Sequence, residues 1–160
     1  YILLFAIILS SCENQTEPTG SGYWIAEDGN EKFVNASDDY TDIFKAWVEA
    51  HNEKDIDKVL SYETEDVILD LPDGTLIEGK EAHSQGLENY FNLDPELNLF
   101  WALPYVGVNN AEVWIIAGSV EDTTTEEGKQ SRLLMVDAQF TEDKLSRIIF
   151  YEKARPSSQN

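Results

Sequence analysis

Four side chains in this sequence could transfer protons and fall within segments that are predicted to be folded. They are Asp70, His83, Asp137 and Glu152. Asp70 and Asp137 each interrupt an apolar run, and Glu152 follows the last such run. Carboxylates and imidazoles are common general acids and bases in proteins. These four residues are therefore the candidate catalytic residues, and the elements that carry them decide whether they can meet.

The faces of the predicted strands determine where the carboxylates point, because alternate side chains of a strand lie on opposite faces. We expect two alternating apolar sets to face the core: Val67, Leu69 and Leu71 in one strand, and Leu134, Val136, Ala138 and Phe140 in another. Asp70 and Asp137 then lie on the outer face, as solvated or interface carboxylates, unless the register slips by one residue. In the last strand, Ile148, Phe150 and Glu152 share the inward face.

The two histidines give a weak case for a metal site. His51 falls near the C-terminal end of a predicted helix, where a partly exposed imidazole interacts with the helix dipole. His83 falls near the start of another helix. No carboxylate motif accompanies them, and the sequence has no P-loop, no dinucleotide-binding glycine motif and no calcium loop. The sequence therefore predicts no metal and no cofactor.

The first half of the chain is predicted to form helices around one strand. One helical face is predicted from recurring apolar side chains: Tyr40, Ile43, Phe44, Trp47 and Val48. Asp55 caps a short second helix, residues 67–71 form a strand, and Pro72-Asp73-Gly74 turns the chain. A third helix runs from Gly79 to about Asn92.

The second half reads as strands. The predicted strands and turns are residues 97–108, the turn at Asn109-Asn110, residues 113–120, a polar loop at 121–129, and a closing hairpin of residues 132–140 and 145–152. Helices followed by a meander of strands indicate an α+β fold, in which a curved mixed sheet wraps around the helices.

This order of elements resembles the NTF2-like superfamily, in its SnoaL-like branch. The phrases that carry the resemblance are Trp47…Asp55-Ile56-Asp57, Tyr62…Glu65-Asp66-Val67 and Asp73-Gly74…Ile77-Glu78-Gly79-Lys80. It extends over roughly three-quarters of the chain. It implies a cone of three N-terminal helices packed in a curved mixed β-sheet, with a pocket between them. Aromatic side chains would line that pocket as ligand-binding residues: Trp47, Tyr62, Trp101, Tyr105, Trp114 and Phe150.

The chain departs from the ketosteroid-isomerase branch of the family at three positions. That branch places an Asp before the proline that ends its first strand, where this sequence has Leu71. Its oxyanion-hole Asp corresponds to Val136, one residue from Asp137, and its oxyanion tyrosine corresponds to Trp47. A tryptophan donates one N–H but cannot replace a phenol. The resemblance therefore does not bring that isomerase's chemistry with it.

Two other catalytic arrangements of this fold can be compared with the sequence at the same level. The epoxide-hydrolase branch needs an Arg-x-Asp on one strand, and Arg132 is followed by two leucines. Families of this fold also use pairs of a histidine and an aspartate in the pocket. A dyad of His83 with Tyr62 or Asp70 therefore stays open, and Glu152, at the mouth of the implied cone, competes with both aspartates as the base.

The charge balance of the chain limits its partners. The 160 residues contain 31 acidic and 11 basic side chains, for a net charge of −20. Such a surface repels nucleic acids and anionic lipid headgroups. The sequence therefore predicts no nucleic-acid partner, and most of the charge is interpreted as a solvated coat that aids solubility.

The beginning of the chain reads as a secretion signal. Residues 1–9 form an apolar run that is too short to span a bilayer, and residues 1–11 are interpreted as a signal peptide truncated at its start. Leu9-Ser10-Ser11-Cys12 resembles a bacterial lipobox, which makes Cys12 the lipidation site. We expect residues 12–36 to form the lipidated tether and residues 37–155 the domain. The protein would then be held outside the cytoplasm at the cell envelope by its lipid anchor.

Two functions remain open from the sequence. The first is a membrane-anchored, non-catalytic domain that binds a small apolar ligand or a protein partner in its cavity. The alternative is a cyclase-, isomerase- or dehydratase-like enzyme that uses a pocket carboxylate or histidine as its acid–base group. A homodimer is also expected, because apolar residues fall on the predicted outer face: Leu133, Met135, Ile149 and Tyr151.

The expected lipidation can be tested directly. Radiolabelled palmitate should enter the wild-type protein in bacterial cells and should be absent from Cys12→Ser, because the thiol is the acylation site. Equal labelling of the two proteins would contradict the prediction.

Overall fold

The computed structural model describes residues 20, 22–25, 31–126 and 128–155. Its helices are α1 (Asp39–Asn52), α2 (Ile56–Ser61), α3 (Lys80–Tyr90) and the 3-10 turn η1 (Phe91–Leu93). Its strands are β1 (Gly22–Trp24), β2 (Glu31–Asn35), β3 (Glu63–Asp70), β4 (Leu76–Glu78), β5 (Glu96–Gly107), β6 (Val113–Thr125), β7 (Gly128–Thr141) and β8 (Lys144–Ala154). The signal peptide and Cys12 predicted above lie outside the described residues. Within those residues, no helix has the length and apolar character needed to cross a membrane.

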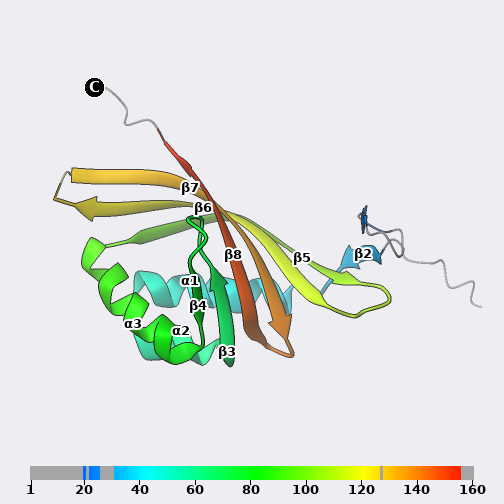
Figure 1. Ribbon diagram of the computed structural model, residues 1–160. Coiled ribbons are helices and arrows are strands. Elements are labelled where there is room, and N and C mark those ends of the chain that lie inside the picture. The colour runs from blue at the N-terminus through cyan, green and yellow to red at the C-terminus, as the bar shows by residue number, and fades with distance from the viewer. Residues whose placement is uncertain (1–19, 21, 26–30, 127, 156–160) are drawn as a thin grey trace, which may run out of the picture.

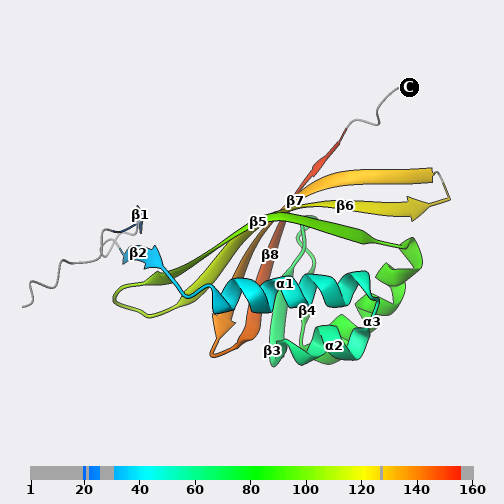
Figure 2. The ribbon, with the colours of Figure 1, turned by 180° about the vertical axis from the view of Figure 1, so that it is seen from behind.

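The described strands form one mixed sheet in the order β1-β2-β5-β6-β7-β8-β3-β4. Strands β5 to β8 make an antiparallel meander, and β8 pairs in parallel with β3. The three α-helices lie together on one face of the curved sheet (Figures 1 and 2). This arrangement confirms the predicted α+β cone.

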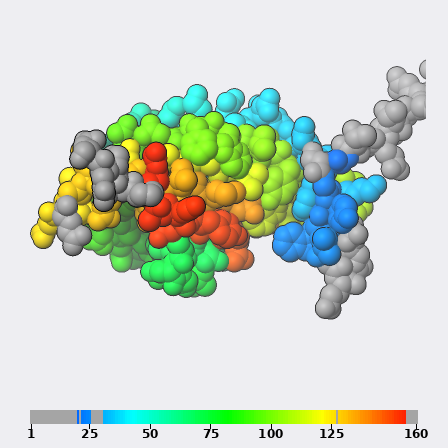
Figure 3. All heavy atoms as spheres, turned by 90° about the horizontal axis from the view of Figure 1, so that it is seen from above, coloured from blue at the N-terminus to red at the C-terminus, as the bar shows by residue number. Residues whose placement is uncertain are grey.

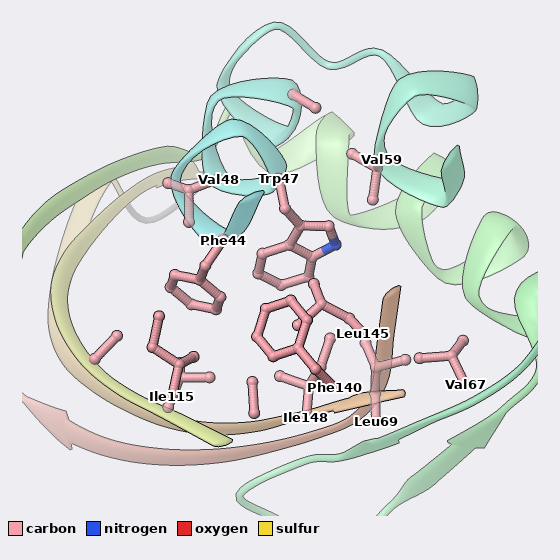
Figure 4. Close-up of a cluster of buried hydrophobic side chains, with 14 of the residues drawn as sticks. Phe44, Trp47, Val48, Val59, Val67, Leu69, Ile115, Phe140, Leu145 and Ile148 are labelled. Carbon is pink, nitrogen blue, oxygen red and sulfur yellow. The ribbon is translucent and has the colours of Figure 1, made fainter. Parts of the chain in front are cut away.

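The core lies between the helices and the inner face of the sheet. Figure 4 shows Phe44 and Trp47 of α1 pointing from the helix towards side chains of the sheet. Phe44, Leu145 and Ile148 are almost fully enclosed. The inward faces predicted from alternation are confirmed, because Val67 and Leu69 are buried, as are Leu134, Val136, Ala138 and Phe140. Asp55 also caps α2 as expected, since its side chain accepts a 3.0 Å hydrogen bond from the backbone of Lys58.

Three predicted boundaries were wrong. The polar loop expected at 121–129 is instead the continuation of two paired strands, because β6 extends to Thr125 and β7 starts at Gly128. Strand β3 begins at Glu63, four residues before the predicted strand. The sheet also includes β2, whose Phe33 pairs with Gly107 of β5, so ordered structure begins before the boundary expected at residue 37.

The outer face of the sheet carries apolar side chains in solvent. Leu133, Met135 and Tyr151 are exposed there, as the alternation predicted. Figure 3 looks onto the molecule from above and shows β7 and β8 side by side across this face, with β1 and β2 at one end. Burial of this patch against a second copy stays a prediction.

Trp47 is expected to contribute strongly to stability, because its side chain is 3% exposed. Trp47→Ala should lower the free energy of unfolding by about 3–5 kcal/mol, the range for removing a large buried aromatic side chain. Urea denaturation followed by circular dichroism measures the change. The matched control is Trp24→Ala in β1, where the side chain is 64% exposed. A similar loss in both variants would contradict the assigned role of Trp47.

Candidate functional site

A buried carboxyl group joins two helices to the sheet. Glu63 is 1% exposed and lies at the start of β3. Its Oε1 accepts a 2.8 Å hydrogen bond from Trp47 Nε1 of α1. Its Oε2 lies 2.9 Å from His83 Nδ1 in the first turn of α3. Since a carboxylate only accepts hydrogen bonds, it favours the imidazole tautomer with its proton on Nδ1, which leaves Nε2 as the basic nitrogen.

A second buried histidine stands beside this pair. The ring centroid of His51 lies 6.3 Å from that of His83 and 4.2 Å from that of Trp47. His51 Nδ1 lies 2.8 Å from the backbone carbonyl oxygen of Trp47. The pKa of His51 is lowered to about 4, chiefly by burial; the hydrogen bond to the Trp47 backbone opposes this fall, and the neighbouring His83 adds to it. His51 is therefore neutral at pH 7, and the expectation of a partly exposed imidazole at this helix end was wrong, because the side chain turns towards the core.

A second polar cluster joins the C-terminal end of α3 to the sheet. The buried Glu121 of β6 accepts a 2.6 Å hydrogen bond from the Tyr90 hydroxyl. Arg132 of β7 donates its Nε to Glu121 and its Nη1 to Glu152 of β8. Burial raises the pKa of Tyr90 well above its usual value, and the negative charge of Glu121 raises it further. Tyr90 therefore stays a hydrogen-bond donor to Glu121 at neutral pH.

Both clusters border one cavity of about 330 Å³ between the helices and the sheet. Its polar lining residues are His51, His83, Tyr90, Ser119, Glu121 and Arg132, and the indole of Trp47 also faces it. The rest of the lining is apolar or glycine: Phe44, Val48, Leu69, Leu71, Pro72, Ile77, Gly86, Leu87, Leu97, Leu99, Ala117, Leu134, Val136 and Phe150. A concave, mostly apolar space with a few converging polar groups is typical of a small-molecule site.

The four candidate catalytic residues are not brought together. Among them, His83 lines the cavity, and its partner is Glu63 instead of the expected Tyr62 or Asp70. Asp70 lies on the outer face, where its Oδ2 is 3.4 Å from Arg147 Nη2. Glu152 is exposed and paired with Arg132. Asp70 and Asp137 alternate with the buried apolar residues of β3 and β7, so their side chains point to the outer face.

Asp137 also lies on the outer face, where it accepts a 2.8 Å hydrogen bond from the Tyr105 hydroxyl. Partial burial raises the pKa of the Asp137 carboxyl, and this hydrogen bond opposes the rise. Burial also raises the pKa of the Tyr105 hydroxyl, and the hydrogen bond to Asp137 raises it further. Neither Tyr105 nor Asp137 is among the residues that line the cavity with His83.

The aromatic ligand-binding candidates divide between the two faces. Trp47 and Phe150 line the cavity, whereas Tyr62, Trp101, Tyr105 and Trp114 do not. The register of β5 shifts between Leu99 and Trp101, which turns Trp101 and Tyr105 to the face of Gly118 and Trp114. A side chain at Gly118 would meet Trp101 Nε1 at 2.3 Å, so the glycine makes room for that indole. Tyr62 packs against the core at the end of α2.

Sequence reasoning missed two buried glutamates of the site, Glu63 and Glu121. Glu121 continues the inward alternation of Ile115, Ala117 and Ser119, which is the signal that could have identified it. Glu63 gives a weaker signal, because the pairing of β3 with β8 is irregular between Glu63 and Ile68. In the described part of the chain, no three His, Cys, Asp or Glu side chains are grouped so that they could hold a metal ion.

Solved structures share this arrangement of helices and sheet. A cystatin-fold protein from Novosphingobium aromaticivorans is 24% identical, with a TM-score of 0.57, over 70% of this chain and 97% of its own. SalBIII, an epoxide hydrolase/cyclase-like enzyme of pyran ring formation in the polyether salinomycin, is 15% identical, with a TM-score of 0.61, over 71% of this chain and 90% of its own. An LEH-like epoxide hydrolase of M. tuberculosis is 12% identical, with a TM-score of 0.59, over 72% of this chain and 83% of its own.

At these identities the likeness concerns the fold alone. No protein-family model matches the sequence, and no curated protein matches it. The structural neighbours and the mixed eight-stranded sheet of the described residues confirm the predicted NTF2-like cone fold.

The buried His51 should make stability depend on pH. Its pKa of about 4 in the folded protein lies below the usual value of 6.5, so the unfolded chain binds the proton more tightly. The stabilisation is therefore complete above about pH 6.5 and is lost as the pH falls towards 4. Between pH 7 and pH 5 the loss should be on the order of 2 kcal/mol.

The matched control is His51→Asn, whose amide can still donate to the Trp47 carbonyl but does not titrate. Urea unfolding of both proteins at pH 7 and pH 5 isolates the effect, because Asp137 and the other acids titrate in both. A wild-type advantage that stays constant between the two pH values would show that His51 does not titrate in this way.

Proposed function

We propose that this domain binds a small, largely apolar molecule in its cone-shaped cavity and acts on it by acid–base chemistry, with His83 as the general base. The observation that carries this proposal is the 2.9 Å contact between His83 Nδ1 and the buried Glu63. A carboxylate that holds one imidazole nitrogen fixes the tautomer and orientation of the ring. The cyclase-, isomerase- or dehydratase-like alternative therefore has a base, although none of the carboxylates first expected to fill that role supplies it.

The surroundings of His83 support the assignment. His83 lines the cavity and is 4% exposed, so its Nε2 would act in a space with little water. Glu63 has its second oxygen occupied by Trp47 Nε1, which keeps the carboxyl group from turning away from the imidazole. The base is thus held by groups that belong to the core, as catalytic geometry requires.

The cavity lining supports a small, largely apolar molecule. A volume of about 330 Å³ lies within the range of small-molecule pockets. Phe44, Leu87, Leu99 and Phe150 are among its apolar walls. Two solved structures of the same fold are described as an epoxide hydrolase/cyclase-like enzyme and an epoxide hydrolase, so this fold can act on small molecules.

Binding without catalysis is the second candidate function, because most of the lining is apolar and the two strand aspartates face away from it. In either case we propose that the lipid anchor expected at Cys12 places the domain at the cell envelope. The anchor would then locate the domain, while its ligand enters the cavity.

A proton-abstraction probe separates the two functions. 5-Nitrobenzisoxazole is a small, neutral, mostly apolar ring. A base removes its C3 proton, the electrons of that C–H bond form a nitrile, and the N–O bond breaks to release a coloured phenolate. We expect saturable catalysis by the wild type and a fall in kcat/KM of about 100-fold in His83→Asn. The Asn amide can still donate to Glu63 but has no basic nitrogen.

Asp137→Asn is the control, because it removes a carboxylate from the outer face without touching the cavity. It should keep the wild-type rate. Saturable binding of the probe with equal turnover in the wild type and His83→Asn would contradict the enzyme and favour the binding domain. Absence of any saturation would contradict the cavity itself as a binding site.

A further inference from the structure

We propose that the cavity selects a neutral ligand carrying a hydroxyl or N–H group, and that this group donates a hydrogen bond to Nε2 of His51. The inference rests on the proposed function and specifies the chemistry of its ligand. In the part of the chain that the structure describes, the hydrogen-bonding atoms at the histidine end of the cavity include an acceptor that lacks a donor.

His51 presents an acceptor to the cavity. Its Nδ1 contacts the carbonyl oxygen of Trp47, which can only accept, so the single proton of the neutral ring must lie on Nδ1. Nε2 is then an unprotonated acceptor, and among the described residues it has no hydrogen-bond partner. Among all the described residues, the fully enclosed side-chain atoms that lack a hydrogen-bond partner are Thr41 Oγ1, Thr64 Oγ1 and Arg147 Nε. His51 Nε2 does not belong to this set of fully enclosed atoms, as expected for a residue that lines the cavity.

The neighbouring groups offer no donor to His51. The N–H of Trp47 is used by Glu63, and His83 Nδ1 faces the same carboxyl group. The rings of His51 and His83 are 6.3 Å apart between centroids, and no hydrogen bond joins them. A ligand that brings a donor would satisfy the acceptor, whereas a purely apolar ligand would bury it unpaired.

The charges of the lining argue for a neutral ligand. Arg132 is the lining residue with a permanent positive charge, and it already binds both Glu121 and Glu152. An anionic ligand would therefore meet two carboxylates around one guanidinium, in a chain whose net charge is −20. Ser119 adds a buried hydroxyl to the lining, but a hydroxyl both donates and accepts, so it does not select for donors.

The two polar clusters set the scale of the ligand. His83 and Tyr90 are seven residues apart on α3, which corresponds to about 10 Å along the helix axis. Leu87 lies between them on the cavity side. A bicyclic ring with one polar substituent has a length of the same order as this span, and Leu87 is the apolar contact expected for the ring.

Three naphthalenes of nearly equal size provide the test by equilibrium dialysis at pH 7. 2-Naphthol offers a neutral donor, 2-methoxynaphthalene lacks the donor, and 2-naphthoate is an anion. We expect the wild type to bind 2-naphthol about tenfold more tightly than 2-methoxynaphthalene, the value of one hydrogen bond to a buried acceptor. 2-Naphthoate should bind most weakly.

His51→Phe should bring the ratio between the first two probes close to one, since it keeps an aromatic ring at this position but has no acceptor nitrogen. The outcomes are separable from those of the proposed function. Equal binding of 2-naphthol and 2-methoxynaphthalene by the wild type overturns the donor requirement and leaves the apolar cavity standing. A preference that persists in His51→Phe overturns the assignment to His51. Tightest binding of 2-naphthoate overturns the neutral ligand, and no binding of any probe overturns both proposals.

Discussion

The fold and the site depend on the same buried group, the carboxyl of Glu63. Burying a carboxyl group away from water is costly unless its oxygens receive hydrogen bonds. Here one oxygen accepts from Trp47 of α1 and the other faces His83 of α3. The hydrogen bonds that satisfy Glu63 therefore also dock both helices on β3. Loss of either partner would leave a buried polar group unsatisfied, so the position of His83, the proposed base, is linked to the stability of the core.

The sequence predicted the parts of the fold that repeat a simple period. The helical face through Phe44 and Trp47 and the inward face of β7 were correct, because burial of alternating or helically spaced apolar residues leaves a regular pattern. It failed where tertiary contacts override composition. The residues after Glu121 are polar, yet they form a strand because β7 pairs with them across the hairpin. The partners of Glu63 are 16 and 20 residues away in sequence, and no local pattern joins them.

The departures from the ketosteroid-isomerase pattern have a common structural meaning. Leu71, Val136 and Trp47 all line the cavity. The sequence resemblance implies that these are the positions of that branch's acid, its oxyanion carboxyl and its tyrosine. The sheet side of the pocket is thereby apolar except at Ser119, Glu121 and Arg132. Its basic nitrogens come from α1 and α3, so acid–base capacity lies on the helical layer.

The placement of His83 follows from a short chain of backbone contacts. The N–H of Gly79 donates to the carbonyl of Val67 at 2.7 Å, and the N–H of His83 donates to the carbonyl of Gly79 at 3.1 Å. Gly79 has φ +82°, a conformation that residues with a side chain rarely adopt. The glycine thus lets the chain turn directly from β4 into α3 while bound to β3. Because Glu63 belongs to the same strand, β3 holds both the start of the helix that carries the imidazole and the carboxyl group that orients it.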